Sequence, residues 1–137
     1  MADFDASMKI AASGLKAQQG RMRVIAENVA NADSTARNAS EDPYRRRIPT
    51  FKSTFDKAIG AAVVTQGRTE VDRSDFRSQY EPGHPAADAN GYVKYPNVES
   101  LIETMDLKEA QRSYEANLNI VTGTRRMVLK TLDILKG

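Results

Sequence analysis

Apolar side chains recur with alternating spacings of four and three residues at both ends of the chain, and this pattern constrains the fold most. Such spacing places apolar side chains on a single face, as in a helix that packs in a coiled coil. All five prolines lie between residues 33 and 96, and proline in a helix interior removes a hydrogen bond and clashes with the preceding turn. The sequence therefore predicts terminal helices at residues 1–32 and 97–137, separated by a middle segment at residues 33–96.

The N-terminal seam is apolar or small except at Gln18. Asp3 and Asp5 stand in the first turn, where carboxylates interact favourably with the positive end of the helix dipole. The side chains of Asn28 and Asn31 suit bonds to exposed backbone groups as the helix terminates, so we interpret them as a helix stop. The seam consists of Phe4, Met8, Ala11, Leu15, Gln18, Met22, Ile25 and Val29. We expect subunit packing at Leu15, Met22, Ile25 and Val29.

The C-terminal seam follows Pro96. Asn97 is a favourable N-cap residue, and Glu99 and Glu103 follow where carboxylates favour a helix N-terminus. The seam consists of Leu107, Ala110, Tyr114, Leu118, Val121, Arg125, Val128, Leu132 and Leu135. We expect subunit packing at Leu118, Val121, Val128, Leu132 and Leu135.

The C-terminal helix carries a second apolar face. Ile120, Met127 and Ile134 recur every seven residues, and at about 100° per residue they lie on a different side from the seam. One face is expected to pack against the N-terminal helix in an antiparallel, coiled-coil-like pair. The middle segment has too few large apolar residues to cover the other, so this face predicts a second subunit.

The middle segment has no sustained helical or strand period. Short extended pieces are expected at Ile48–Phe55 and Ala61–Val71, and the residues from Gly83 to Tyr92 are typical of turns. A structureless run of this length is unusual in a compact domain. We therefore expect a mainly α fold with an irregular or short β-hairpin excursion, or an arm that becomes ordered on a partner.

Composition excludes several classes of function. The 137 residues allow one compact domain or one elongated subunit. The formal net charge is only +2, which does not indicate a nucleic-acid partner. Without cysteine, thiolate catalysis and cysteine zinc sites are excluded. The N-terminal stretch lacks the apolar run of a signal peptide or membrane span, so any export is expected without a cleaved signal peptide.

Candidate catalytic and metal-binding residues are few. His84 is the only histidine and lacks convergent partners, so we interpret it as a turn residue. The helical spacing of Glu99, Glu103, Asp106 and Glu109 fits a solvated face rather than an acid–base pair. We expect no enzymatic activity, no metal, no cofactor and no small-molecule substrate.

Two further features leave alternatives open. The tract from Arg45 to Arg47 either lies on a solvated face or contacts phosphate, peptidoglycan or an acidic neighbour. Gly123 lies inside the predicted C-terminal helix, where glycine costs roughly 0.5–1 kcal/mol relative to alanine. With Thr122 and Thr124 beside it, Gly123 either permits the close approach of another helix or marks a weak point.

Two stretches resemble a known family. The first stretch resembles the N-terminal signature of the flagellar axial proteins of the rod, hook and filament junctions. It runs from Ala11 to Thr35 and reads AASGLKAQQGRMRVIAENVANADST. The stretch from Tyr80 to Val121 contains HPAADANGYVKYPNV and RSYEAN and is similar to the proximal rod proteins of that family. Glu27 stands where the family often has asparagine. The signature positions are Asn28, Asn31, His84, Pro85, Gly91, Tyr92, Pro96, Asn97, Tyr114, Glu115 and Asn117.

The resemblance implies a structural subunit that assembles helically into the periplasmic rod of the basal body, the drive shaft and export conduit that transmits torque to the hook. It implies as partners further copies of the chain, other proximal and distal rod proteins and a rod-base adaptor. It also implies delivery by the flagellar type III export apparatus. Two alternatives stay open: another short rod protein or rod-base adaptor, and a cytoplasmic helical chaperone of export clients.

Overall fold

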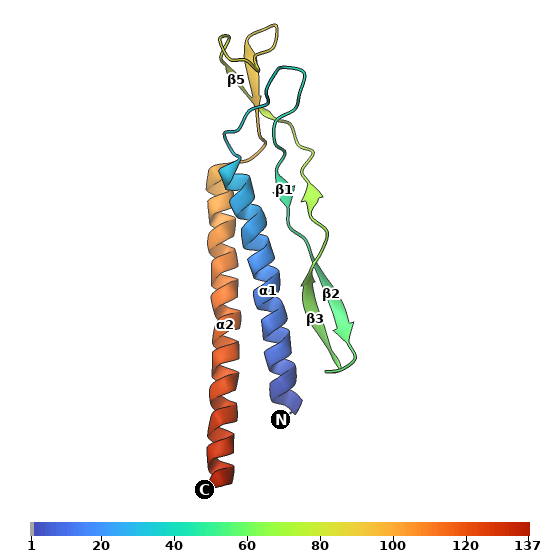
Figure 1. The fold of residues 1–137 in the computed structure, drawn as a ribbon, viewed down its shortest axis with the longest axis vertical. Helices are drawn as coiled ribbons and strands as arrows, with labels where there is room; N and C mark the ends of the chain where they lie inside the picture. Colours follow the sequence, from blue (N-terminus) through green and yellow to red (C-terminus); the bar gives the residue numbers. More distant parts are fainter. Residues whose placement is uncertain (1) are drawn as a thin grey trace. The chain divides into compact units, whose positions relative to one another are not determined.

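The computed structural model describes residues 2–137 and confirms a mainly α fold with two long terminal helices in contact. Helix α1 spans Ala2–Ala30 and helix α2 spans Ser100–Lys136 (Figure 1). Among the described residues, neither helix is apolar enough over a sufficient length to cross a membrane. The helix bounds follow the sequence pattern closely at both ends of the middle segment.

Six short strands lie between the helices and form three antiparallel pairs. β1 (Arg47–Ile48) pairs with β4 (Glu70–Val71), and β2 (Phe51–Asp56) pairs with β3 (Ala61–Gln66). These four strands confirm the extended pieces expected in this region. β5 (Arg77–Tyr80) pairs with β6 (Tyr92–Tyr95) across the expected turns, and the sequence did not predict this pair.

The described residues form two compact units, one made of three separate pieces of the chain and the other of two. The helical unit contains residues 2–22, Thr50–Arg68 and Lys108–Gly137. The mixed unit contains Arg23–Pro49 and Thr69–Leu107, and therefore the end of α1, the start of α2 and four of the strands. The division of the chain into segments at residues 1–32, 33–96 and 97–137 stays a prediction.

The helical unit brings α1 and α2 together in antiparallel orientation. Arg21 Nη2 lies 3.7 Å from Glu109 Oε2, and Gly14 lies opposite Asn117. A Cβ atom at Gly14 would stand 2.9 Å from the Asn117 amide group, so a side chain at this position would have to displace that amide. The β2–β3 hairpin lies beside α1, where the Val64 N–H donates to Ser13 Oγ at 3.2 Å.

The mixed unit contains the large side chains that are completely buried. They have less than 2% of their surface exposed and come from α1, β6, the segment before α2 and the first turn of α2. Two of them are polar. These residues are Ile25, Asn28, Val93, Pro96, Val98 and Glu103.

Candidate assembly interface

The predicted packing residues differ widely in how much this chain covers them. Ile25 is buried in the mixed unit, whereas Val29 on the same helix is exposed. Partial burial is shared by Leu15, Met22, Val121 and Val128. Leu118 and Leu132 are each 40% exposed, and Leu135 is 78% exposed. Most of these side chains therefore retain apolar surface for a further partner, and their role in subunit packing stays a prediction.

Helix α2 extends beyond its partner helix in the helical unit. It has 37 residues against 29 in α1, and the pairing of Gly14 with Asn117 and of Arg21 with Glu109 fixes their register. At equal rise per residue, the start of α1 lies opposite about Leu129. The last turns of α2 therefore have no part of α1 opposite them (Figure 1).

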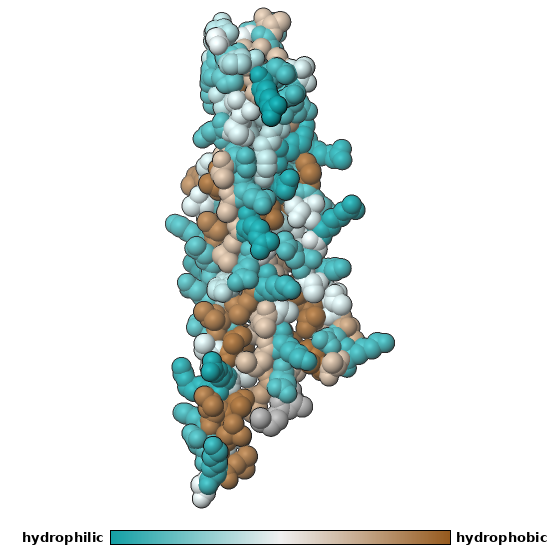
Figure 2. Space-filling model, in the orientation of Figure 1, coloured by the Kyte–Doolittle hydropathy of each residue, from teal (hydrophilic) through white to brown (hydrophobic). Residues whose placement is uncertain are grey.

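The second apolar face of α2 is exposed over half or more of each of its side chains. Ile120 is 50%, Met127 55% and Ile134 78% exposed. Figure 2 shows apolar side chains gathered at the C-terminal end of α2. A stripe of large apolar side chains facing water along several turns is typical of a protein interface.

A polar atom is buried without a partner in the N-terminal seam. Gln18 Oε1 finds no hydrogen-bond partner among the described residues. Gln18 is the position that interrupts the apolar seam of α1. A single polar side chain in such a seam is a known means of specifying register.

The β2 strand has little packing of its own. All its side chains except that of Asp56 are exposed, including Phe51 and Phe55. Side chains on β3 alternate between partial burial and exposure, and this strand contacts α1 through the Val64 N–H. A two-stranded hairpin is marginally stable in water unless another element covers it.

Asn28 holds the main chain of β1 in the mixed unit. Its Nδ2 donates to the Arg47 carbonyl oxygen at 2.8 Å, and its Oδ1 accepts from the Arg47 N–H at 2.9 Å and from Tyr44 Oη at 2.7 Å. The helix-stop interpretation of Asn28 is therefore wrong, because the chain brings a strand to its amide. Asn31 does bond the helix end, through Nδ2 and the Glu27 carbonyl oxygen at 2.9 Å.

Asn97 binds the main chain of Arg46, the residue directly before β1. Its Oδ1 accepts from the Arg46 N–H at 2.7 Å, and its Nδ2 donates to the carbonyl oxygens of Asp72 and Ser74 at 3.0 and 3.2 Å. Helix α2 begins only at Ser100. The N-cap interpretation of Asn97 is therefore wrong, since its side chain is engaged by these backbone groups.

Glu103 is buried and paired with Arg46. Arg46 Nε donates to Glu103 Oε1, and the same guanidinium lies 3.4 Å from Asp72 Oδ2 and 3.8 Å from Asp106 Oδ2. Glu103 is only 1% exposed, so its interpretation as part of a solvated face is wrong. The helical spacing of Glu103 does not indicate that Arg46, 57 residues away in the sequence, is its partner.

Charge and burial shift several pKa values in this cluster. Burial lowers the pKa of Arg46, but the hydrogen bond and charge of Glu103, and then those of Asp72, outweigh it and raise that pKa above its ordinary value. The pKa of Asp72 is lowered, first by hydrogen bonds from the backbone and hydroxyl of Ser74 and then by Arg46. Burial raises the pKa of Tyr44. Arg46 and Asp72 are thus held in their charged forms.

The remaining arginines of the tract also have partners within the chain. Arg45 Cζ lies 4.1 Å from the ring centroid of Phe76, and Arg47 Nη1 lies 3.6 Å from Glu27 Oε2. The second of these pairs is about half exposed on both sides, so its contribution to stability is small. Intramolecular pairing engages all three arginines.

The other signature residues serve local geometry. His84 Nδ1 accepts from the Ala86 N–H at 3.0 Å, as in a turn, beside the exposed Pro85. Gly91 has φ of +84°, and a Cβ there would stand 2.8 Å from the Tyr80 ring, which packs edge-to-face on Tyr92. On α2, Asn117 faces Gly14, whereas Tyr114 is half-buried and Glu115 is exposed.

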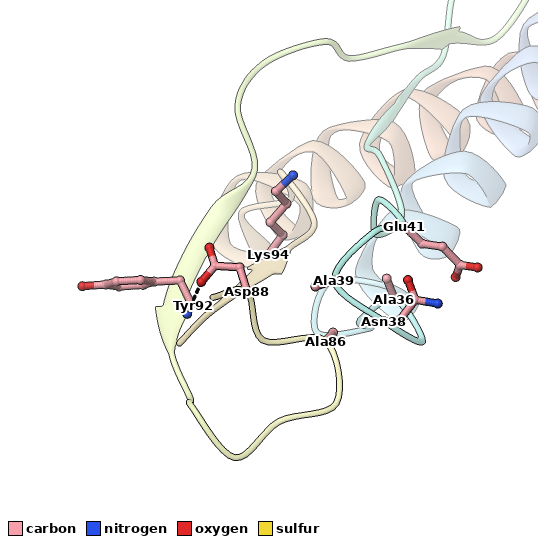
Figure 3. Close-up of a pocket in the computed structure, with 8 residues that line it drawn as sticks. All are labelled: Ala36, Asn38, Ala39, Glu41, Ala86, Asp88, Tyr92 and Lys94. Atoms are coloured by element: carbon pink, nitrogen blue, oxygen red, sulfur yellow. Dashed lines mark hydrogen bonds between the residues drawn. The ribbon is translucent and has the colours of Figure 1, made fainter. Parts of the chain in front are cut away.

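The hollow in Figure 3 is too small for a substrate. It encloses about 20 Å³, which is room for about one water molecule. Tyr92 donates its N–H to Asp88 Oδ1 at 2.9 Å while its ring points away from the hollow (Figure 3). Over residues 2–137 there is no group of three or more acidic or histidine side chains that suits a metal ion. The lining residues are Ala36, Asn38, Ala39, Glu41, Ala86, Asp88, Tyr92 and Lys94.

Several residues that organise the two units were not predicted from the sequence. Gly14 and Gly20 lie in α1 where a side chain would overlap Asn117 and Gln66 respectively. Glycine in a helix interior is unfavourable. Its presence twice inside a predicted helix was therefore the sequence feature that could have indicated a close approach by another part of the chain. Arg46 and Asp72 carried no signal, because charged residues in an irregular segment are usually solvated.

Comparison with known proteins connects this fold to one family. A sequence model described as flagella basal body rod protein matches residues 8–37, and one described as flagellar basal body rod FlgEFG protein C-terminal matches residues 89–134. The flagellar basal-body rod protein FlgC of Agrobacterium fabrum is 49% identical over all of this chain and 99% of its own length. FlgC of Bacillus subtilis is 37% identical, over 95% of this chain and 97% of its own length. FlgC of Salmonella typhimurium is 41% identical, over 91% and 92% respectively.

Proposed function

Because the chain belongs to the FlgC family of flagellar basal-body rod proteins, we propose that it assembles with copies of itself and with other rod proteins through the uncovered apolar faces of its helical unit. It is a structural subunit of the basal-body rod. The observation that carries the proposal is the exposed stripe of Ile120, Met127 and Ile134. Together with the last turns of α2, this stripe provides a second helix face besides the one directed at α1.

The position of this stripe on α2 indicates the kind of contact between subunits. The seam of α2 and the stripe lie on different sides of the helix, so the surface that packs on the stripe differs from the surface that packs on the seam. A surface that meets a different surface on its neighbour makes a heterologous contact, and repetition of such contacts builds an open helical filament. Subunits joined in this way form a rod rather than a closed dimer.

Cysteine cross-linking in motile cells tests the proposed interface. The chain contains no cysteine, so Ile134→Cys introduces a single thiol on the uncovered stripe. A short bifunctional maleimide is expected to give a cross-link between Ile134→Cys and a rod subunit that carries a second cysteine in assembled basal bodies. Arg126→Cys, an exposed position on the polar side of the same helix, is the matched control. Cross-linking by the control alone would contradict the proposed face.

Location and delivery extend the proposal. We place the chain in the periplasmic part of the rod, with its partners including other proximal and distal rod proteins and a rod-base adaptor. Delivery is by the flagellar type III export apparatus without removal of an N-terminal segment. Mass spectrometry of the chain from purified basal bodies is expected to find its N-terminal peptide intact, and deletion of the export gate is expected to retain the chain in the cytoplasm.

Fractionation separates the rod subunit from the two alternatives. A rod subunit co-purifies with detergent-extracted basal bodies, whereas an export chaperone stays in the cytoplasm. A rod-base adaptor would remain in basal bodies that lack the rod. The rod family is structural, and we propose that the chain has no catalytic activity of its own.

A further inference from the structure

Asn90 is the only asparagine of the chain that is followed by glycine. Glycine has no side chain, so in a flexible chain its main-chain nitrogen can reach the carbonyl carbon of the preceding asparagine side chain. Attack by that nitrogen forms a new N–Cγ bond and a five-membered succinimide ring, and the amide nitrogen leaves as ammonia with the proton from the glycine nitrogen. Water then opens the ring to aspartate or isoaspartate. Asn90 and Gly91 therefore contain every group that deamidation needs apart from water.

The side chain of Asn90 is exposed, but the nitrogen that would attack it is engaged in a turn. Gly91 N–H donates to the Asp88 carbonyl oxygen at 3.0 Å, and Asp88 N–H donates to the Tyr92 carbonyl oxygen at 2.9 Å. Asp88 Oδ1 accepts from the N–H groups of Asn90 and Tyr92, each at 2.9 Å. A carboxylate that bonds the backbone two residues ahead stabilises a turn. The Asp88 carboxylate thus holds residues 88–92, the Asp88 turn, in a closed form.

Gly91 is buried and is held on its carbonyl side as well. Its carbonyl oxygen accepts from the Glu81 N–H at 2.8 Å, and a Cβ here would stand 2.8 Å from the Tyr80 ring and 3.2 Å from Pro82. Its φ of +84° is a conformation that favours glycine. Before its nitrogen could turn towards the Asn90 side chain, hydrogen bonds on both sides of Gly91 would have to break. The folded turn therefore withholds the nucleophile from an exposed amide.

We propose that Asn90 is a deamidation site of the unfolded chain and that the Asp88 turn protects it once the mixed unit has folded. In the folded chain the reaction then proceeds only through local opening of the turn, and its rate scales with the fraction of open molecules. Isoaspartate at this position adds one carbon to the main chain and one negative charge. A chain that deamidates before it folds therefore loses the spacing that pairs Tyr80 with Tyr92 across β5 and β6. It also carries a substrate for enzymes that methylate isoaspartyl carboxylates.

Mass spectrometry of the full-length chain tests the proposal. The chain is incubated at mildly alkaline pH in native buffer and in guanidinium chloride, and is then cleaved with trypsin. The peptide of residues 78–94 contains Asn90 as its only asparagine, and enzymatic methylation quantifies the isoaspartate in it. Deamidation of Asn90 is expected to be at least about tenfold slower in native buffer than in guanidinium chloride. Equal rates in the two conditions would overturn the protection.

Asn38 provides a control within the same molecule. It is also exposed, but Ala39 follows it, and the Cβ of alanine hinders attack by the main-chain nitrogen. In guanidinium chloride, Asn38 is expected to deamidate much more slowly than Asn90. Equal rates at the two positions in guanidinium chloride would overturn the assignment of Asn90 as the site.

Asp88→Ala tests the role of the carboxylate, with Asp88→Asn as its matched control. Alanine removes the acceptor for both N–H groups, whereas asparagine keeps a carbonyl oxygen that can accept both. In native buffer, Asp88→Ala is expected to deamidate at Asn90 at least about fivefold faster than wild type, and Asp88→Asn within about threefold of wild type. In guanidinium chloride, all three chains are expected to react at similar rates, because there is no turn to open.

The contrary outcomes of the variant experiment are distinct. Slower deamidation of Asp88→Ala in native buffer would overturn the proposal, because the carboxylate would then promote the attack as a base. A rate equal to that of wild type would show that other contacts hold the turn, and it would overturn the role of Asp88. Loss of the folded tyrosine fluorescence in Asp88→Ala would also overturn a local role of Asp88, and the comparison of native with denatured wild type would still test protection by the fold.

Discussion

Asn28 on α1 and Arg47 on β1 are joined by two hydrogen bonds of the kind that pair neighbouring strands, with donor–acceptor distances of 2.8 and 2.9 Å. Arg47 also pairs with Val71 of β4 on the other side of β1. The asparagine side chain thus occupies the place that a third strand would take. This explains how a strand of only two residues remains in a defined register with a helix end.

Glu103→Gln is expected to destabilise the mixed unit by about 1–3 kcal/mol. Removing one charge of a fully buried ion pair costs about 3–5 kcal/mol, but Arg46 keeps Asp72 as a second partner and is itself 22% exposed. The smaller range therefore applies. Urea unfolding followed by tyrosine fluorescence measures the change, because four of the five tyrosines lie in the mixed unit and the chain has no tryptophan.

Glu99→Gln provides the matched control for Glu103→Gln. Glu99 is exposed one turn earlier in the sequence, and exposed substitutions usually change stability by less than about 0.5 kcal/mol. Equal destabilisation by the two variants would show that burial of Glu103 contributes nothing specific.

Acid is expected to weaken the mixed unit through Asp72. The folded-state pKa of Asp72 is lowered from its ordinary value of 3.8, first by hydrogen bonds from Ser74 and then by Arg46. A carboxyl group with a lowered folded-state pKa contributes stability above its unfolded pKa, and the contribution is lost as the pH falls through the folded pKa. In Asp72→Asn this contribution is absent. The difference in unfolding free energy between wild type and Asp72→Asn should therefore shrink from about pH 5 towards about pH 3.

The sequence predicted the long elements well because their signal is local. Seven-residue repeats define α1 and α2 without knowledge of the partner, and prolines and turn residues define the segment between them. The expected extended pieces became β1 to β4. The β5–β6 pair was missed because each strand has only four residues, which is too short to show a strand period.

The polar cluster was not predictable in the same way, because its signal is nonlocal. Asn28 and Asn97 have sequence neighbours that suit a helix stop and an N-cap, and only the fold brings Arg46 and Arg47 between them. Glu103 has the spacing of an exposed helical carboxylate, and only Arg46 explains its burial. Local sequence rules assign such side chains to the nearest helix end or to solvent.

His84→Ala is expected to leave assembly and swimming nearly intact. His84 accepts one hydrogen bond, from the Ala86 N–H, and approaches Thr35 Oγ1 at 3.5 Å. Loss of such a partly exposed contact costs about 1 kcal/mol. Soft-agar swimming measures the effect. A variant that is exported normally but does not swim would show that this turn contributes directly to an interface.

Val121→Asp and Leu132→Asp are expected to abolish motility by preventing rod assembly. Both side chains are only partly covered in the free chain, so the full cost of burying an unpaired carboxylate, several kcal/mol, arises in the assembled rod. Electron microscopy of basal bodies and a swimming assay check the result. Asn119→Asp introduces the same group at an exposed position of the same helix and is expected to swim. Normal swimming by both Val121→Asp and Leu132→Asp would remove the assignment of this seam.

The purified, dilute chain is expected to contain much less helix than the assembled rod. Helices α1 and α2 hold 29 and 37 of the 137 residues, about half of the chain, yet most of this helix lies in a unit that fully buries only alanine among its apolar residues. Ordering those helices costs backbone and side-chain entropy, and the pairing of α1 with α2 must also offset closure of the long loop between them. Without neighbours to cover Ile134 and Leu135, which are both 78% exposed, this cost is not offset.

Circular dichroism of the dilute chain shows whether α1 and α2 form only on assembly or already fold without neighbours. Helix content well below half, rising when the chain assembles, is the expected result, because folding and binding are then one event in which the contact energy is reduced by the cost of ordering. A subunit of this kind would also remain unfolded at its ends during export and would not polymerise early. Helix content close to half in the dilute chain, with one cooperative thermal transition, would show instead that the two helices fold without neighbours.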